Sequence, residues 1–206
     1  MLDRQTDRDG NTLFEAVSVG VNGFGVKNTQ FFFGYRPEEK ILIGDRLLSQ
    51  SYFSYFVQFD PYRRIPRVTI QGRVGESIDF GSGRVGDGAS ISLGTTLRPL
   101  DRLDLRVDAT RETLDVEGSR IFTVYIERLR AQYSFSAKSL VRVIAQNVGP
   151  ELDQGSFLGS VLYSYKVNWQ TVLFVGYGDQ GVLTPGNDYT SGSRSLFFKV
   201  SYAYQR

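Results

Sequence analysis

The sequence predicts an all-β fold, a transmembrane antiparallel up-and-down β-barrel with about twelve strands. Three observations predict it. Apolar and polar residues alternate along most of the chain, tight turns alternate with longer loops, and the last strand is aromatic on one face. Successive side chains of a strand point to opposite faces of the sheet, and a membrane barrel needs one apolar and one polar face.

Prolines and alternation together define the first third of the chain. Strands are predicted there at residues 12–21, 29–36, 40–45, 52–59 and 67–75, after a polar N-terminal segment at 1–11. Turns are expected at 36–39 and 60–66, because proline interrupts a hydrogen-bonded ladder and favours turn geometry. The strand at 40–45 is short for a membrane span, which needs about 9–11 residues. The predicted barrel covers residues 12–206.

The rest of the chain repeats the alternation more regularly. Seven further strands are predicted near residues 88, 103, 121, 139, 157, 170 and 194. In the second of these, Leu103, Leu105 and Val107 fall on one face, opposite Asp104 and Arg106. A helix would scatter such residues around its axis, so a strand fits better. The residues expected to face lipid on successive strands are Leu93, Leu105, Tyr133, Val143, Tyr163, Val175 and Phe198.

The chain ends with an aromatic strand. Its faces hold Leu196, Phe198, Val200, Tyr202 and Tyr204 on one side, and Phe197, Lys199 and Ser201 on the other. Outer-membrane barrels have such strands because aromatic girdles mark the boundary between lipid and water. A strand of this kind commonly closes a bacterial barrel and is recognised by the barrel-assembly machinery. Outer-membrane lipid and this machinery are therefore the expected partners.

The connections differ in composition. Tight turns are expected at 98–102, at 136–139 and near Asn168, and longer loops rich in Gly, Asp, Ser and Pro at 76–88, 111–119, 147–156 and 179–193. Short periplasmic turns and long outer loops are the layout of a transmembrane barrel. The twelve strands give an even number, which places both ends in the periplasm.

Composition excludes several classes of function. The chain contains no Cys and no His, so it has no disulfide, no Cys/His zinc site and no Ser-His-Asp triad. The Gly-rich run 81–86 has dinucleotide-motif spacing, but no helix follows it. No stretch approaches the roughly 20 apolar residues of a membrane helix. A net charge of +2 gives no reason to propose nucleic acid. We expect no catalytic residue, cofactor or metal.

The polar faces of the strands carry an excess of positive charge. The candidate residues lining the lumen, which could form an anion path, are Arg67, Arg73, Arg98, Arg106, Arg128, Arg130, Arg142, Lys166 and Lys199. On the strands predicted best they face only Asp104 and Asp108. Fixed positive charge in a narrow tube favours anions. The open alternative is that these side chains cross-link the wall, pair with loop acids such as Asp153 and leave no path.

A resemblance to a known family rests on the C-terminal part of the chain. The stretches 168–178 and 194–206, with the hairpin at 129–140, resemble the end of an uncharacterised bacterial family, the domain of unknown function 5916. In that family a carbohydrate-binding-like module of the family-nine type precedes an outer-membrane barrel. The resemblance implies a Gram-negative outer membrane. Because neither the module nor a signal peptide is present here, we expect this chain to be the C-terminal part of a longer protein.

Two functions follow for such a barrel. It could act as a pore for small anionic solutes or carbohydrate, or as the membrane anchor of a periplasmic binding module. The alternative from another class is a soluble β-sandwich or lipocalin-like binding protein, with the same alternation but its apolar face turned inward.

Overall fold

A computed structural model describes residues 2–7, 10–150, 154–184 and 188–204, and all regular structure within these ranges is β-strand. The strands are β1 (Leu2–Thr6), β2 (Thr12–Phe24), β3 (Gln30–Ile43), β4 (Arg46–Phe59), β5 (Arg67–Asp79), β6 (Arg84–Leu100), β7 (Leu103–Val116), β8 (Ser119–Ser134), β9 (Ser139–Pro150), β10 (Gly155–Lys166), β11 (Thr171–Leu183) and β12 (Tyr189–Tyr202). No helix in the described ranges has both the length and the apolar character to cross a membrane.

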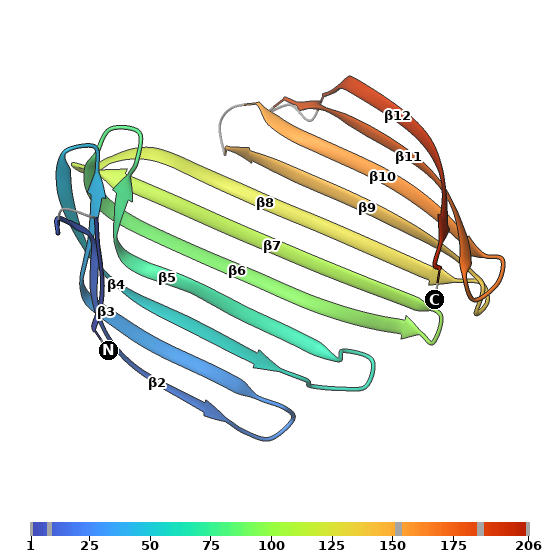
Figure 1. Cartoon of the computed structure of the whole chain (residues 1–206), viewed down its shortest axis with the longest axis horizontal. Coiled ribbons are helices and arrows are strands. Elements are labelled where there is room, and N and C mark those ends of the chain that lie inside the picture. The colour runs from blue at the N-terminus through green and yellow to red at the C-terminus, as the bar shows by residue number, and fades with distance from the viewer. Residues whose placement is uncertain (1, 8–9, 151–153, 185–187, 205–206) are drawn as a thin grey trace. The chain divides into compact units, whose positions relative to one another are not determined.

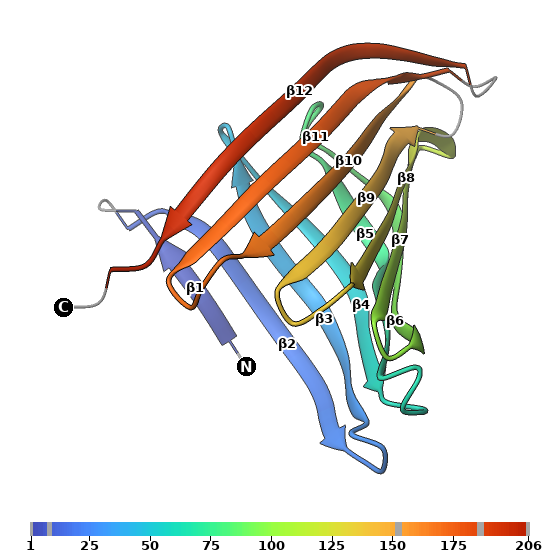
Figure 2. The same cartoon turned by 90° about the vertical axis from the view of Figure 1, so that its right-hand side faces the viewer.

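The strands form one antiparallel sheet in which every strand pairs with its neighbours in the chain, from β1 to β12 (Figure 1). This up-and-down order confirms the predicted fold class. The chain divides into two compact units. The first holds Met1–Asp60, Val68–Leu93 and Thr110–Val124, and the second holds Pro61–Arg67, Gly94–Ala109 and Tyr125–Arg206. In the second unit β9, β10, β11 and β12 run side by side (Figure 2).

The predicted turn at 36–39 is wrong, and so is the separate strand at 40–45. Both belong to β3, which pairs continuously with β4 except for a bulge: Arg36 pairs with Tyr52, and Glu39 pairs with Gln50. Pro37 lies inside this bulge, where its missing N–H costs no ladder hydrogen bond. The bulge therefore absorbs the residues that the sequence pattern assigned to a turn.

The N-terminal segment also differs from the prediction. Residues within 1–11 form β1, whose five residues are all exposed and which pairs with β2 from Leu2↔Val17 to Thr6↔Thr12. The total of twelve strands is correct because this unpredicted strand replaces the one wrongly placed at 40–45. Polar residues form β1 because its ladder hydrogen bonds use the backbone and need no apolar side chain.

Among the connections whose residues are all described, the predicted difference in loop length is not present. Strands extend through most of the Gly- and Asp-rich stretches, so the connections at 80–83 and 117–118 are as tight as those at 101–102 and 135–138. At 117–118 the turn uses two residues with positive φ, Glu117 (53°) and Gly118 (76°). This is the geometry of a two-residue hairpin whose twist matches that of its strands.

One face of β3 and β4 in the first unit is aromatic. The rings of Phe33, Phe53 and Tyr55 stack along one face, with centroids 6.2 Å and 6.4 Å apart. Tyr55 also covers Gly72 of β5, where a Cβ atom would lie 2.6 Å from the Tyr55 hydroxyl and 2.1 Å from a backbone oxygen. Ser54 lies between Phe53 and Tyr55 and therefore points to the opposite face. This opposite face is mixed, because Phe32 and Phe56 pair there beside Ser54.

The first unit also contains a small core. Its buried apolar side chains are Ala16, Ile78, Leu114 and Val116, of which Leu114 is 2% exposed. Beside it, the buried carboxylate of Glu39 accepts hydrogen bonds from Arg36, from Gln50 (2.6 Å) and from the Tyr52 hydroxyl (3.0 Å). A buried carboxylate needs several donors to offset its lost hydration, and this one has three.

The second unit exposes an apolar face. Of the seven residues expected to face lipid, Leu93 belongs to the first unit and the other six to the second. Those exposed on the surface are Leu93, Tyr133, Val143, Tyr163, Val175 and Phe198, while Leu105 is half-buried. Val143, Val161 and Tyr177 pair directly across β9, β10 and β11, so they form one apolar row.

One carboxylate interrupts this apolar face near the 184–188 end of β11. Asp179 accepts hydrogen bonds from Tyr177 (3.2 Å), Tyr189, Ser191 (2.8 Å) and Arg194 (3.0 Å). A bulge in β12 at Gly192 makes this possible, because Gln180 pairs with Ser193 while Gly181 pairs with Ser191. The extra residue shifts Tyr189 and Ser191 onto the same face as Arg194. The four side chains that donate hydrogen bonds to Asp179 therefore lie on the same face of the sheet.

Candidate solute path on the polar face

Two of the predicted cations are paired with the predicted acids. Arg98 Nε lies 2.7 Å from Asp104 Oδ1, and Arg106 Nε lies 2.9 Å from Asp108 Oδ2. All four side chains are at least about one-third exposed, so each pair adds only about 0–1 kcal/mol to stability. These pairs reduce the excess of positive charge without removing it.

A small pocket of ≈ 200 Å³ brings three of the predicted cations together. Arg98, Arg106 and Arg130 line it, with Asp104, Thr96, Leu105 and Gln132. Gln132 Oε1 also accepts hydrogen bonds from Arg142 Nε (3.2 Å) and Nη2 (3.0 Å). Arg130 lies near enough to Arg142 for the two guanidinium groups to repel each other. Cations from β6 to β9 therefore share one polar surface.

A larger basic pocket lies near the 135–138 and 167–170 turns. Its volume is ≈ 690 Å³, and its cationic lining residues are Arg102, Lys138, Arg142 and Lys166. Four serines, at positions 134, 136, 139 and 164, line it as well. None of its lining residues is acidic. With the charge of four cations unopposed in its lining, this pocket attracts anions.

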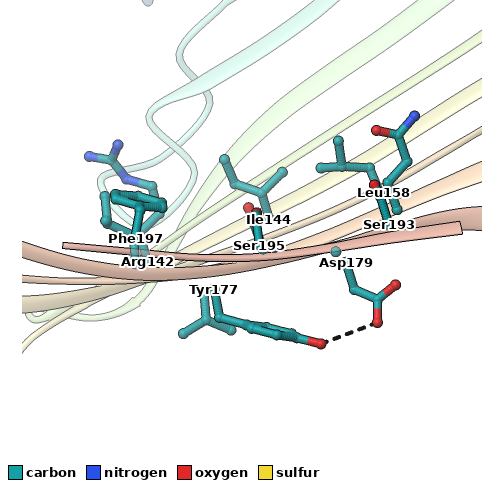
Figure 3. Close-up of a pocket in the computed structure, with 14 residues that line it drawn as sticks. Arg142, Ile144, Leu158, Tyr177, Asp179, Ser193, Ser195 and Phe197 are labelled. Atoms are coloured by element: carbon teal, nitrogen blue, oxygen red, sulfur yellow. Dashed lines mark hydrogen bonds between the residues drawn. The ribbon is translucent and has the colours of Figure 1, made fainter. Parts of the chain in front are cut away.

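An adjoining pocket of ≈ 380 Å³ has a different character. Ile144, Leu158, Leu162 and Phe197 form its apolar wall, and Arg142 stands at one end. Figure 3 shows Arg142, Ile144, Leu158, Ser193, Ser195 and Phe197 on one side of the sheet, whereas Tyr177 and Asp179 lie on the other. The face predicted to be polar is therefore half apolar between β9 and β12.

Four predicted path residues lie apart from these pockets. Arg73 belongs to the first unit, where it lies 3.5 Å from Glu112, donates to Ser77 (3.1 Å) and stacks over the Tyr52 ring (5.8 Å). Arg67, Arg128 and Lys199 line none of the three pockets described above. Lys199 pairs across the sheet with Phe174. The sequence pattern thus assigned to one path residues that lie in two different units of the fold.

The sequence pattern missed Arg102 and Lys138 because both lie in turns. Arg102 Nη1 donates to the carbonyl of Phe135 (3.4 Å), and the Lys138 carbonyl accepts from the Lys166 backbone N–H (2.7 Å). These bonds hold the turns against the neighbouring strands. The sequence did contain a signal for these two residues. Each of the two turns joins strands that carry predicted path residues, so a basic residue in the turn lies at the end of the same face.

The described residues offer no metal site: they contain no cluster of three or more His, Cys, Asp or Glu side chains with suitable spacing. Asp179 instead uses its oxygens to accept hydrogen bonds from tyrosine, serine and arginine. The predicted loop partner Asp153 lies outside the described residues.

The fold and its two faces define a class of protein. The described strands form a twelve-stranded up-and-down sheet, and in the second unit one of its faces is apolar while the other carries cations; this strand order and alternation are typical of outer-membrane β-barrels. Among solved structures, the chain is similar to the outer membrane channel DcaP of Acinetobacter baumannii, with a TM-score of 0.64 and 12% sequence identity over 92% of this chain. The match covers 63% of that channel's chain. At this identity the likeness shows the fold alone. No family model and no curated protein matches the chain.

Proposed function

We propose that this chain forms a pore in the outer membrane of a Gram-negative bacterium and that the pore favours anions. The observation that carries the proposal is the group of predicted path cations for which the described residues provide no acidic partner: Arg67, Arg128, Arg130, Arg142, Lys166 and Lys199. The fold likeness to an outer membrane channel supports the location. Passive conduction through such a pore would need no catalytic residue, cofactor or metal.

The physical reason is electrostatic. A cation in water attracts an anion weakly, but in a narrow passage with low-dielectric walls the attraction is several times stronger. Arg130, Arg142 and Lys166 lie on consecutive strands of the second unit. A permeating anion would meet them in succession, and binding at several weak sites permits both entry and exit.

The exposed apolar face supports a membrane location over a soluble binding protein. Val161, Tyr163, Val175 and Phe198 are each 39–65% exposed. A soluble sandwich would bury such residues between its sheets, and a monomeric soluble protein rarely exposes so large an apolar patch. Outer-membrane lipid is therefore the proposed partner of this face, and the barrel-assembly machinery is its proposed insertion partner.

A second candidate is the membrane anchor of a periplasmic carbohydrate-binding-like module. The resemblance of residues 168–178 and 194–206 to the barrel end of such proteins favours it. The Arg98–Asp104 and Arg106–Asp108 pairs also fit it, because they could stiffen a wall that encloses no path. An anchor needs a folded barrel but no conductance.

Planar-bilayer recording separates the two functions. With a gradient of potassium chloride across the bilayer, an anion-favouring pore gives a reversal potential that favours chloride. Arg130→Glu should move that potential toward potassium, because it replaces an unpaired cation with an anion. Arg46→Glu, an equal charge change at the start of β4 in the first unit, is the control and should leave the selectivity closer to wild type. A folded, inserted barrel that conducts no ions would refute the pore and leave the anchor.

A further inference from the structure

Arg142 is shared by two pockets on the same face of the second unit, one lined by four cations and the other by Arg142 as its single cation. It lines the basic, serine-rich pocket of ≈ 690 Å³ and also the apolar pocket of ≈ 380 Å³. Its side chain is held between them by Gln132, which accepts two hydrogen bonds from the guanidinium group. The two pockets therefore meet at a fixed positive charge.

The basic pocket can hold an anionic head. Lys138, Arg142 and Lys166 supply N–H donors for an anion, and Ser134 and Ser164 supply hydroxyl groups. Charge-assisted hydrogen bonds of this kind are about twice as strong as neutral ones. Because no acid lines the pocket, a bound anion meets no opposing carboxylate there.

The apolar pocket begins directly beside Arg142. Across the sheet Arg142 pairs with Leu162, Leu162 pairs with Gly176, and Gly176 pairs with Phe197. A Cβ atom at Gly176 would lie 2.3 Å from the Phe197 ring, so the glycine lets that ring lie flat against β11. An apolar floor of leucine and phenylalanine therefore starts at the guanidinium.

The floor continues away from the basic end. The next residues of β10 on this face are Ser160 and Leu158, and from Leu162 to Leu158 a strand advances about 14 Å. Ile144 faces Ser160 across the β9–β10 pair, and Leu158 lies opposite Gln180 on β11. The apolar strip is thus long enough for the body of a small amphipathic molecule.

We propose that this surface binds amphipathic monoanions, with the anionic group at Arg142 and the basic pocket and the apolar body along Leu162, Phe197 and Leu158. The proposal rests on the proposed pore function, since it names the solute class of the same path. A small inorganic anion would leave the apolar strip unused. A solute charged at both ends would place its second charge against Leu158, where the described lining residues on that face supply no cation.

Binding can be measured by calorimetry on the full chain in lipid nanodiscs, with empty nanodiscs as background. The probes are 4-phenylbutyrate, which has an anionic head and an apolar body, acetate, which lacks the body, and 4-phenylbutanol, which lacks the charge. We expect 4-phenylbutyrate to bind at least about tenfold more tightly than either of the others, because only it makes both the charged and the apolar contacts.

Variants assign the two halves of the surface. Arg142→Gln should weaken 4-phenylbutyrate about tenfold or more and leave 4-phenylbutanol unchanged, since it removes the charge alone. Leu158→Ser should weaken both probes that carry the phenyl ring. The matched control is Arg46→Gln, which removes an equal charge at the start of β4, in the first unit and outside both pockets, and it should leave binding unchanged.

The outcomes distinguish this inference from the pore proposal. Equal affinity for acetate and 4-phenylbutyrate, or equal loss from Arg142→Gln and Arg46→Gln, would overturn the inference while chloride-favouring conductance stood. Binding of the predicted kind by a barrel that conducts no ions would uphold the site and overturn the pore. A Leu158→Ser variant that fails to fold is replaced by Leu162→Ser, which tests the same apolar strip.

Discussion

The assignment of the two faces of β10 can be tested by placing arginine at adjacent positions. Val161 is 45% exposed on the apolar face, between Val143 of β9 and Tyr177 of β11. Ser160 precedes it and points to the polar face beside Ile144. Arginine at Val161 should therefore enter lipid, and arginine at Ser160 should enter the solvated side.

The magnitude follows from the depth of Val161. It lies five residues from the end of β10 at Lys166, which is about 17 Å along the strand and about 13 Å along the membrane normal for a strand tilted about 40°. In the proposed pore the apolar band ends before Asp179, whose level is about 18 Å above Lys166, so the midplane lies about 9 Å above Lys166 and Val161 about 4 Å beyond it. Val161→Arg should cost about 2–4 kcal/mol, roughly a 30- to 700-fold loss in the folding equilibrium constant.

Reversible folding into phospholipid vesicles measures this cost. Trp169, the single tryptophan, lies 65% exposed in the 167–170 turn and reports insertion by its fluorescence in a urea titration. Ser160→Arg should cost about 1 kcal/mol or less in the same assay. Equal losses at the two positions, or a larger loss at Ser160, would show that the faces have been assigned wrongly.

Two further predictions concern the first unit. Leu114→Ala should destabilise the fold by about 2–5 kcal/mol in the same titration, since Leu114 is fully buried, and a loss below about 1 kcal/mol would contradict the core described here. At the end of β5, hydrogen bonds from Ser82, and then from the Gly81 and Ser82 amides, lower the pKa of Asp79 below its usual 3.8. The hydrogen bonds to the ionised Asp79 carboxylate should stabilise the 80–83 turn fully above pH 3.8. This contribution should be lost as the pH falls through the lowered pKa of Asp79. The Gly81 amide chemical shift should follow that change in wild type and not in Asp79→Asn.

The period-two pattern predicted most strands because pairing in a sheet with two different faces constrains every second residue. It failed where that constraint is absent. In β1 all five residues are exposed, so no face selects apolar side chains. In β3 the sequence around Pro37 has the composition of a turn, and only the partner strand β4 shows that a bulge accommodates it. The Gly- and Asp-rich stretches were predicted as loops, although backbone pairing extends strands through them.

The candidate path was predictable in part. Alternation placed Arg106, Arg130 and Arg142 on one face, and the structure brings them onto adjacent strands. The sequence alone could not show that Arg98 and Arg106 use the nearby acids, because that depends on side-chain conformation. The apolar strip was missed for another reason. Leu158 and Leu162 are apolar residues on a face that the sequence pattern predicted to be polar. Their neighbours on β11 and β12 become known only when the strand pairing is known.

The carboxylate of Asp179 limits the thickness of the bilayer in which the proposed pore could lie. It stands eight residues from the start of β11 at Thr171, a rise of about 21 Å along the membrane normal for a strand tilted about 40°. Hydrocarbon must end before the carboxylate, and the exposed Trp169 in the preceding turn suits the opposite interface. The average bilayer core is about 30 Å thick, and the bacterial outer membrane is thinner than average. Hydrophobic mismatch would therefore exclude the proposed pore from thicker membranes.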